Sequence, residues 1–213
     1  MIEVPVGAMP ERLPLFPLGV VLFPGGRLPL RIFETRYMDM VKRCLKDETP
    51  FGICLIADGQ ETGKPARPHA TGTLAHIASW DMETLGILEI VVSGGERFRV
   101  LAHAADANGL VTGEVRALPV APVTPIPARF ARLVPLLRAI IAELGNAANA
   151  PAAPHRFFDA GWVGMRYAEM LPIGRAARQS LLEIDDPLDR LEIIFRFLEG
   201  KSLLPDAGSG EAT

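Results

Sequence analysis

The sequence predicts an α+β fold in which a β domain comes first and a helical domain follows. Short apolar runs separated by Pro and Gly recur through the first half of the chain, as they do in a sheet of short strands. A proline-rich stretch at 119–127 then predicts a stiff, extended linker. Beyond it, apolar residues recur at intervals of three and four, which is typical of amphipathic helices. We therefore expect a β domain at 1–120, a helical domain at 121–204 and a disordered polar tail at 205–213.

The opening stretch predicts a strand, a tight turn, a second strand and a helix. Pro14 and Pro17 favour an edge or lead-in strand, because proline donates no ladder hydrogen bond. The continuously apolar run Val20–Phe23 predicts a strand buried on both faces, and Leu28–Phe33 predicts another after the Pro-Gly-Gly turn. Apolar residues at helical spacing then predict an amphipathic helix: Tyr37, Met38, Val41, Cys44 and Leu45.

The rest of the β domain is predicted to consist of short strands. They cover residues 51–56, 73–80, 85–93, 97–104 and 110–118, with a turn at Gly94-Gly95. The polar stretch from Asp58 to Thr71 predicts a loop of about 14 residues, a length typical of functional or mobile loops. Arg97 and Arg99 alternate with apolar residues, which favours an exposed strand face with charge partners. Together these strands predict a small, partly closed barrel.

Four helices are predicted in the second half. The first follows an apolar face from Phe130 to Leu144, and the second covers 156–170. A short third helix is expected at 175–183. Asp185-Asp186-Pro187 marks the start of the last helix, because an acid suits the cap position and proline suits the first turn. Gly200 is a natural stop for it.

Composition argues against several classes of partner and location. The formal net charge of −3 is unlike the basic footprint of a general nucleic-acid binder. No apolar run approaches the ~18 residues of a membrane-spanning helix, and the amino-terminal residues do not form a secretory signal. We therefore expect a cytoplasmic protein that contacts neither nucleic acid nor membrane. The two cysteines are expected to be buried free thiols.

Motifs for catalysis or metal binding are missing from the sequence. The run Gly59–Pro65 has three residues between its glycines and a proline after the lysine, so it does not match a phosphate-binding loop. The four histidines lack metal-ligand spacing. No serine stands in a nucleophile-elbow context, and Ser180 and Lys201 fall on different predicted helices. We expect no catalytic residue, no metal and no cofactor.

Several segments carry a resemblance to a known family. They are LPLFPLGVVLFPG, LPLRIFETRYMDMV, Gly72-Thr73, the run GERFRV at 95–100 and AEMLPIGRAARQSLLEIDDPLDRLEIIFRFL. In this order they resemble the N-terminal substrate-binding domain of Lon-type ATP-dependent proteases, and more closely the stand-alone bacterial proteins that carry only that domain. The resemblance covers about residues 12–199. It implies a PUA-like pseudobarrel β domain followed by a helical bundle.

The same resemblance implies a non-enzymatic protein that binds unfolded or exposed apolar protein segments, as an adaptor for a protease or as a chaperone-like factor. The ATPase and Ser-Lys protease modules of Lon proteases follow this domain, and neither fits the present sequence. PUA-like folds also bind RNA, which the acidic balance opposes. A small molecule in the barrel and an unrecognised hydrolase site between barrel and bundle are further alternatives. The sequence contains no sustained heptad pattern, and it therefore does not predict an oligomeric state.

Five residues are candidates for peptide contact. Trp80 lies at a strand end beside a turn, and Trp162 lies between two glycines of a predicted helix. The alternative for Trp162 is a structural plug between barrel and bundle. Glu34 is expected to cap the first helix, and Arg36 and Tyr37 are expected to anchor that helix to the β domain. Ligand contact is the alternative for these three residues.

Overall fold

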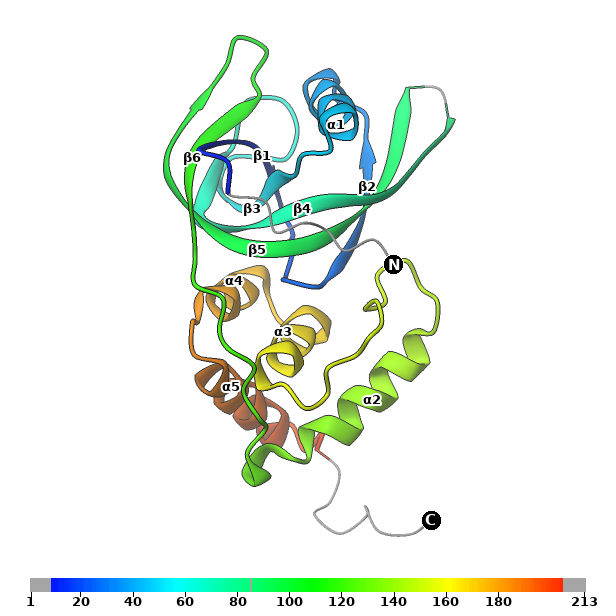
Figure 1. Ribbon diagram of the computed structural model, residues 1–213, viewed down its shortest axis with the longest axis vertical. Helices are drawn as coiled ribbons and strands as arrows, with labels where there is room; N and C mark the ends of the chain where they lie inside the picture. Colours follow the sequence, from blue (N-terminus) through cyan, green and yellow to red (C-terminus); the bar gives the residue numbers. More distant parts are fainter. Residues whose placement is uncertain (1–8, 85, 205–213) are drawn as a thin grey trace.

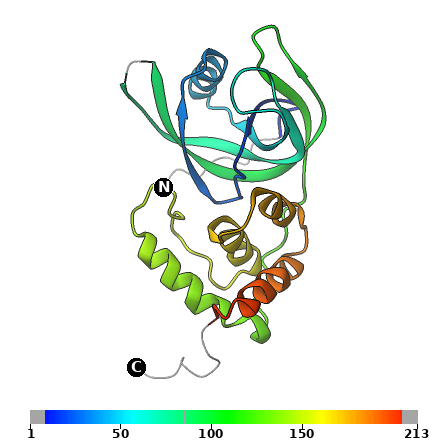
Figure 2. The same ribbon diagram turned by 180° about the vertical axis from the view of Figure 1, so that it is seen from behind.

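The structure is a computed structural model that describes residues 9–84 and 86–204. Strands and one helix form the upper part in Figure 1, and the remaining helices form the lower part, here called the helical portion. The view from behind in Figure 2 shows the same two layers. The strands are β1 (Arg12–Leu18), β2 (Arg27–Ile32), β3 (Phe51–Asp58), β4 (Arg67–Thr84), β5 (Ile87–Ala105) and β6 (Val111–Ala117). The helices are α1 (Thr35–Asp47), α2 (Leu133–Leu144), α3 (Ala160–Met170), α4 (Arg175–Glu183) and α5 (Pro187–Gly200).

The strands form one curled, mixed sheet in the order β2-β5-β4-β3-β1-β6. Strand β1 runs parallel to β3, and the other pairs are antiparallel. Strand β6 pairs with both β1 and β5, which closes most of the sheet upon itself. Register shifts interrupt the long β4–β5 ladder and the β5–β6 ladder, and such bulges increase the local bend. The predicted pseudobarrel of an α+β fold is confirmed.

The lead-in strand predicted around Pro14 and Pro17 is present as β1, but its predicted place at an edge and the separate strand predicted at Val20–Phe23 are wrong. Strand β1 precedes the run Val20–Phe23, which is irregular, and β1 is an interior strand paired on both sides. Each proline removes one hydrogen-bond donor from β1. The apolar side chains between and beside the prolines are nevertheless buried in the core. Burial therefore outweighs the lost ladder bonds. The irregular run is held instead by a side chain, because the Thr73 hydroxyl donates to the Leu22 carbonyl at 2.7 Å.

A turn at Gly94-Gly95 is also absent from the described residues, because β5 continues through both glycines. The reason is a close approach of another segment. The amide of Gly25 donates to the Gly94 carbonyl at 2.7 Å, and the Gly94 amide donates to the Gly26 carbonyl at 2.9 Å. The predicted loop after Asp58 ends earlier than expected, since β4 begins at Arg67.

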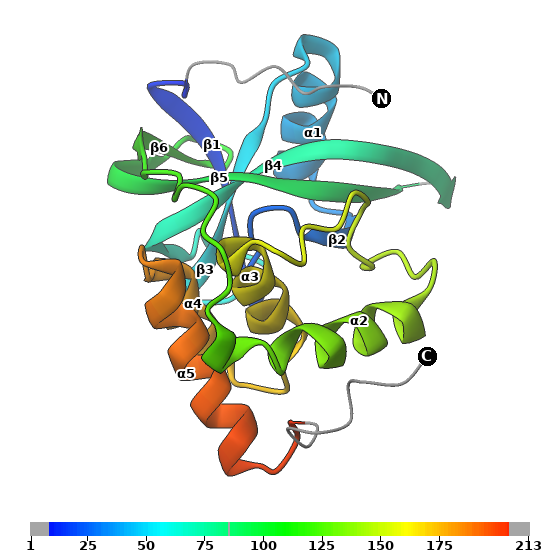
Figure 3. The same ribbon diagram turned by 60° about the horizontal axis from the view of Figure 1, so that its bottom comes forward.

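Helix α1 covers one face of the sheet, and α2–α5 lie on the other side (Figures 1 and 3). Its buried face carries Tyr37, Met40 and Val41, as the helical spacing predicts. The ring of Phe16 on β1 stacks on Tyr37 with centroids 3.9 Å apart. A separate apolar cluster fills the inside of the helical portion, where α3 packs against α5 and α4.

The helical boundaries follow local caps. Helix α3 begins at Ala160, later than predicted, because Asp159 accepts from the amide of Gly161 at 3.0 Å. Asp186 caps α5 by accepting from the amide of Leu188 at 2.7 Å. The bounds of α4 are as predicted, and a short 3₁₀ helix precedes α2.

The predicted tail at 205–213 lies outside the described residues. Among the residues that are described, no helix has both the length and the apolar character needed to cross a membrane.

Both cysteines are buried free thiols, as predicted. Burial raises the pKa of Cys44, and it raises the pKa of Cys54 to about 12. Because the thiolate is the reactive form, we expect neither cysteine to react with Ellman's reagent in mildly alkaline buffer while the chain is folded. Both should react within minutes after denaturation in guanidinium chloride. Rapid labelling of one thiol in the folded chain would contradict this expectation.

Candidate functional site: a cleft between sheet and helices

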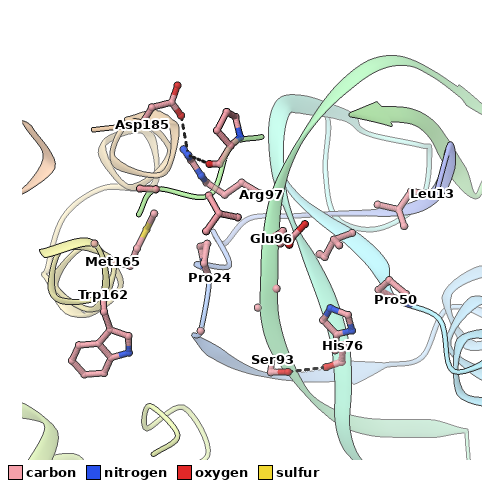
Figure 4. A pocket seen from close by; sticks show the side chains of 18 of the residues that line it. Leu13, Pro24, Pro50, His76, Ser93, Glu96, Arg97, Trp162, Met165 and Asp185 are labelled. Carbon is pink, nitrogen blue, oxygen red and sulfur yellow. Dashed lines mark hydrogen bonds and ion pairs between the residues drawn. The ribbon is translucent and has the colours of Figure 1, made fainter. Parts of the chain in front are cut away.

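An open cleft of about 760 Å³ lies where the sheet meets the helical portion. One side is formed by apolar side chains of the sheet and its loops, among them Leu13, Pro50 and Leu74. Trp162 and Met165 of α3 form the opposite side, and Figure 4 shows them across the cleft from Leu13 and Pro50. The exposed linker segment at 119–121 borders the same cleft. The cleft is therefore built from segments far apart in the sequence.

Trp162 is held in place by other rings. Its indole lies 5.2 Å from the Phe157 ring in an edge-on arrangement and 5.7 Å from His155, measured between centroids. The Arg138 guanidinium lies 3.9 Å from the centroid of Phe157. Only 8% of Trp162 is exposed, so the residue both packs at the junction and borders the cleft. Such a fixed aromatic surface is a suitable anchor for an apolar ligand.

Arg97 joins the sheet to the helical portion, and the prediction that it lies on an exposed face is wrong. It is only 6% exposed, because α4 and the linker cover this side of β5. Its guanidinium donates to the carbonyl of Leu182 in the last turn of α4 at 2.8 Å and to that of Ile184, just after the helix, at 3.2 Å. It also pairs with Asp185 at 2.8 Å, as Figure 4 shows. Arg99 is exposed, as predicted.

Arg166 makes a second connection between the two parts. Here the side chain comes from the helical portion and reaches backbone carbonyls of the β part. From α3 it donates to the carbonyls of Pro24 at 2.7 Å and Gly25 at 2.6 Å, which fixes the turn beside the cleft. Its charge is balanced by Glu169 at 3.2 Å. Burial lowers the pKa of Arg166 and raises that of Glu169, because both charged forms lose hydration. A guanidinium suits this role, since its fork reaches two carbonyls at once.

The sheet side of the cleft also carries two titratable side chains. His76 of β4 and Glu96 of β5 are both half-buried (Figure 4). Burial lowers the pKa of His76 below its ordinary value of 6.5, and the negative charge of Glu96 opposes that shift. The imidazole is therefore largely neutral near pH 7. It leaves the charge of Glu96 uncompensated.

Ser93 and His76 both line the cleft, but they are not arranged as a nucleophile and its general base. The hydroxyl of Ser93 donates to the backbone carbonyl of His76 at 3.5 Å and not to the imidazole, so the two side chains do not form a nucleophile–base pair. Within residues 9–84 and 86–204, no group of three or more His, Cys, Asp or Glu side chains is placed to hold a metal ion.

The other candidate residues lie outside the cleft. Trp80 is 59% exposed on the β4–β5 hairpin, where Met82 is 40% exposed. Glu34 stands at the N-cap of α1, but its side chain makes no capping bond and instead pairs with Arg36 at 2.9 Å, which corrects the predicted cap. Arg36 also donates to the Gly109 carbonyl at 3.0 Å. Together with the stacked Tyr37, it anchors α1 to the barrel.

Sequence reasoning missed most of the residues that build the cleft. Arg166 carried a local signal, because it lies in α3 between positions that are apolar at helical spacing, where a charge requires a buried partner. His76 lies in the strand predicted at 73–80 but carried no functional signal, and Glu96 carried no signal of its own. Their proximity depends on the β4–β5 register, in which His76 stands opposite Ser93.

The curled sheet followed by a docked helical portion defines an α+β fold of the Lon N-terminal type. It closely matches the crystal structure of a Lon N-terminal domain protein from Xanthomonas campestris. The TM-score is 0.73 at 36% identity, and the match covers 87% of this chain and 98% of that one. The N-terminal domain of a Mycobacterium avium complex Lon protease has the same fold at 18% identity, with a TM-score of 0.62 over 89% of this chain and 98% of that one.

The chain belongs to the family of the ATP-dependent protease La (LON) substrate-binding domain, whose family model matches residues 12–200. Among curated relatives, cereblon from Xenopus tropicalis is 30% identical over 113 residues, which are 51% of this chain and 24% of cereblon. Lon protease 2 from Myxococcus xanthus is 30% identical over 101 residues, which are 46% of this chain and 12% of that protease. The match thus spans a quarter or less of these relatives.

Proposed function

We propose that this protein binds extended, apolar segments of other polypeptides in the cleft between sheet and helices. The observation that carries the proposal is the open cleft of about 760 Å³ with apolar side chains on both sides, in a chain of the LON substrate-binding domain family. The clients are unfolded proteins or exposed apolar segments. The protein acts in the cytoplasm without ATPase or peptidase activity of its own, and it presents clients to a protease or chaperone.

The geometry supports a chain-like ligand. The cleft opens to solvent, and Trp162 of α3 lies on the side opposite Leu13 and Pro50. An extended segment advances about 3.3 Å per residue and alternates its side chains, so successive residues can contact opposite sides. Burial of apolar side chains between Trp162 and Leu13 would supply the affinity at about 25 cal/mol per Å² of area removed from water.

Binding is tested with a short, fluorescently labelled apolar peptide and the full chain, read out by anisotropy. We expect saturable binding, and we expect Trp162→Ala to weaken it about tenfold or more, because an aromatic anchor is lost. Met165→Ser is a second cleft variant, and circular dichroism checks that both variants fold. A loss in Trp80→Ala with none in the two cleft variants would place the site on the hairpin. Hydrolysis of ATP or peptide that follows the purified protein would overturn the proposal.

Peptide affinity is expected to depend on the protonation of His76. A bound apolar segment removes water from the half-buried imidazole and disfavours its charged form further, while Glu96 opposes this. The complex then binds fewer protons than the free protein. Affinity for an uncharged peptide should be full at neutral pH and should fall as the pH drops below 6.5 through the lowered pKa of His76. In His76→Gln this part of the pH profile should be flat, and an unchanged profile would contradict the assignment.

A small apolar molecule is the second candidate ligand. The cleft volume falls within the range of about 300–1,000 Å³ that is usual for small-molecule sites. In that case the labelled peptide would not bind, and a small apolar compound would raise the melting temperature of the unchanged chain but not that of Trp162→Ala.

A further inference from the structure

The charged groups of the cleft differ in whether they have partners. Arg97 of β5 pairs with Asp185 at 2.8 Å, and on the helical side Arg156 lies 3.8 Å from Asp159. These charges compensate one another. Glu96, the neighbour of Arg97 on β5, differs from these residues, because none of the described residues forms an ion pair with it.

The surroundings of Glu96 increase the effect of this charge. The carboxylate is half-buried, so solvent screens it less than a surface charge. Its neighbour His76 is largely neutral near pH 7 and supplies no positive charge.

Three other lining charges form no ion pair with a described residue. Arg12 and Glu48 are exposed at the rim and of opposite sign, so water reduces their effect. Arg190 is buried, and its guanidinium is directed to the backbone carbonyls of Leu181 and Ile184 in the helical portion.

Glu96 also lies between the two apolar sides of the cleft. In Figure 4 it stands between Leu13 and Pro50 on one side and Trp162 and Met165 on the other. A segment that spans the cleft would thus meet apolar surface, then one negative charge, then apolar surface. Charge complementarity selects a basic side chain at that position.

From this arrangement we propose that the cleft selects apolar segments that carry one lysine or arginine flanked by apolar residues, with Glu96 as the partner of the basic side chain. This inference rests on the proposed peptide-binding function and names its substrate class. A carboxylate in the same position of the segment is rejected, because two like charges would share a half-buried site. Glu96 is thereby a specificity-determining residue.

The test uses three labelled peptides that differ only in their central residue, which is Lys, Gln or Glu within an otherwise apolar sequence. For the unchanged full chain at low ionic strength, we expect the Lys peptide to bind about fivefold tighter than the Gln peptide, with the Glu peptide weakest. In Glu96→Gln the three affinities should converge. Glu143→Gln, the same change at an exposed position of α2 outside the cleft, should keep the full preference. Added salt should reduce the preference in the unchanged chain.

The outcomes separate this inference from the proposed function. Equal binding of the three peptides, or a Lys preference that survives in Glu96→Gln, overturns the role of Glu96 and leaves peptide binding in place. Failure of all three peptides to bind overturns the proposed function and the inference together. Because Glu96 forms no ion pair, the Gln variant is expected to fold, and the order of affinities in the unchanged chain tests the selectivity independently of any variant.

Discussion

The Arg97→Ala variant is expected to lose about 2–3 kcal/mol of unfolding free energy, at the upper end of the cost of leaving a buried acceptor without its donor. The guanidinium donates to the carbonyls of Leu182, Ile184 and Pro119 and to the carboxylate of Asp185. Two of these carbonyls stand at the end of α4, where helical carbonyls have no partner within the helix. Alanine would leave the Leu182 carbonyl buried without this donor, at a cost of about 1–3 kcal/mol, whereas the Ile184 carbonyl would keep its hydrogen bond from Arg190.

Urea unfolding followed by circular dichroism measures this loss. Asp185→Asn is the matched control, because it removes only the ion pair. The Asp185 side chain is 70% exposed, so we expect that change to cost at most about 1 kcal/mol. Arg97→Lys should fall between the two variants, since an ammonium lacks the planar fork that reaches several acceptors. If Arg97→Ala costs no more than Asp185→Asn, the carbonyl contacts contribute little.

The same experiment tests the predicted division into domains at residue 120. Arg97 and Arg166 connect the sheet and the helical portion in both directions along the chain. If the two parts fold as one cooperative unit, the unchanged chain shows a single transition, and the Arg97→Ala variant shows one at lower urea. Two transitions in the variant would indicate that the β part and the helical portion are separate domains joined by this contact.

Local patterns predicted the elements whose signals are local. Helix α5 begins at Pro187 after its Asp186 cap, and α1 follows the spacing of its apolar residues, because caps and periodicity act within a few residues. Alternation along β5 placed Arg97 and Arg99 on the same predicted face of the strand. It did not show that α4 covers the face with Arg97, since period two reveals which side chains share a face and not what packs on them.

The cleft could not be predicted from such patterns. Its walls come from the β4–β5 ladder, the turn after β1 and α3, and the contact of Arg166 with Gly25 joins residues 141 positions apart. A single sequence contains no local trace of such a contact. The glycines of β5 show the same difficulty, because Gly94-Gly95 was predicted as a turn although the smallness of Gly94 serves a close approach between segments.

The Gly94→Ala variant is expected to be destabilised by about 3 kcal/mol or more, at the upper end of the cost of overpacking. A methyl group at this position would overlap the Phe23 carbonyl oxygen and lie 2.9 Å from the carbonyl carbon. These are backbone atoms of a segment that cannot shift easily. The hydroxyl of Thr73 holds the Leu22 carbonyl, and Arg166 holds the turn that follows.

Two other glycines provide the comparison, with thermal melts as the measurement. A methyl group at Gly200 would meet nothing within 4 Å, so Gly200→Ala should leave stability unchanged or slightly raised. At Gly95 it would lie 2.7 Å from Nε2 of His76, a side-chain atom that can rotate away, so Gly95→Ala should cost less than Gly94→Ala. If Gly94→Ala melts like Gly200→Ala, the turn at 24–26 is free to move and the cleft is adjustable on that side. The expected order instead requires a wall held rigidly by backbone contact, against which a bound segment would have to fit.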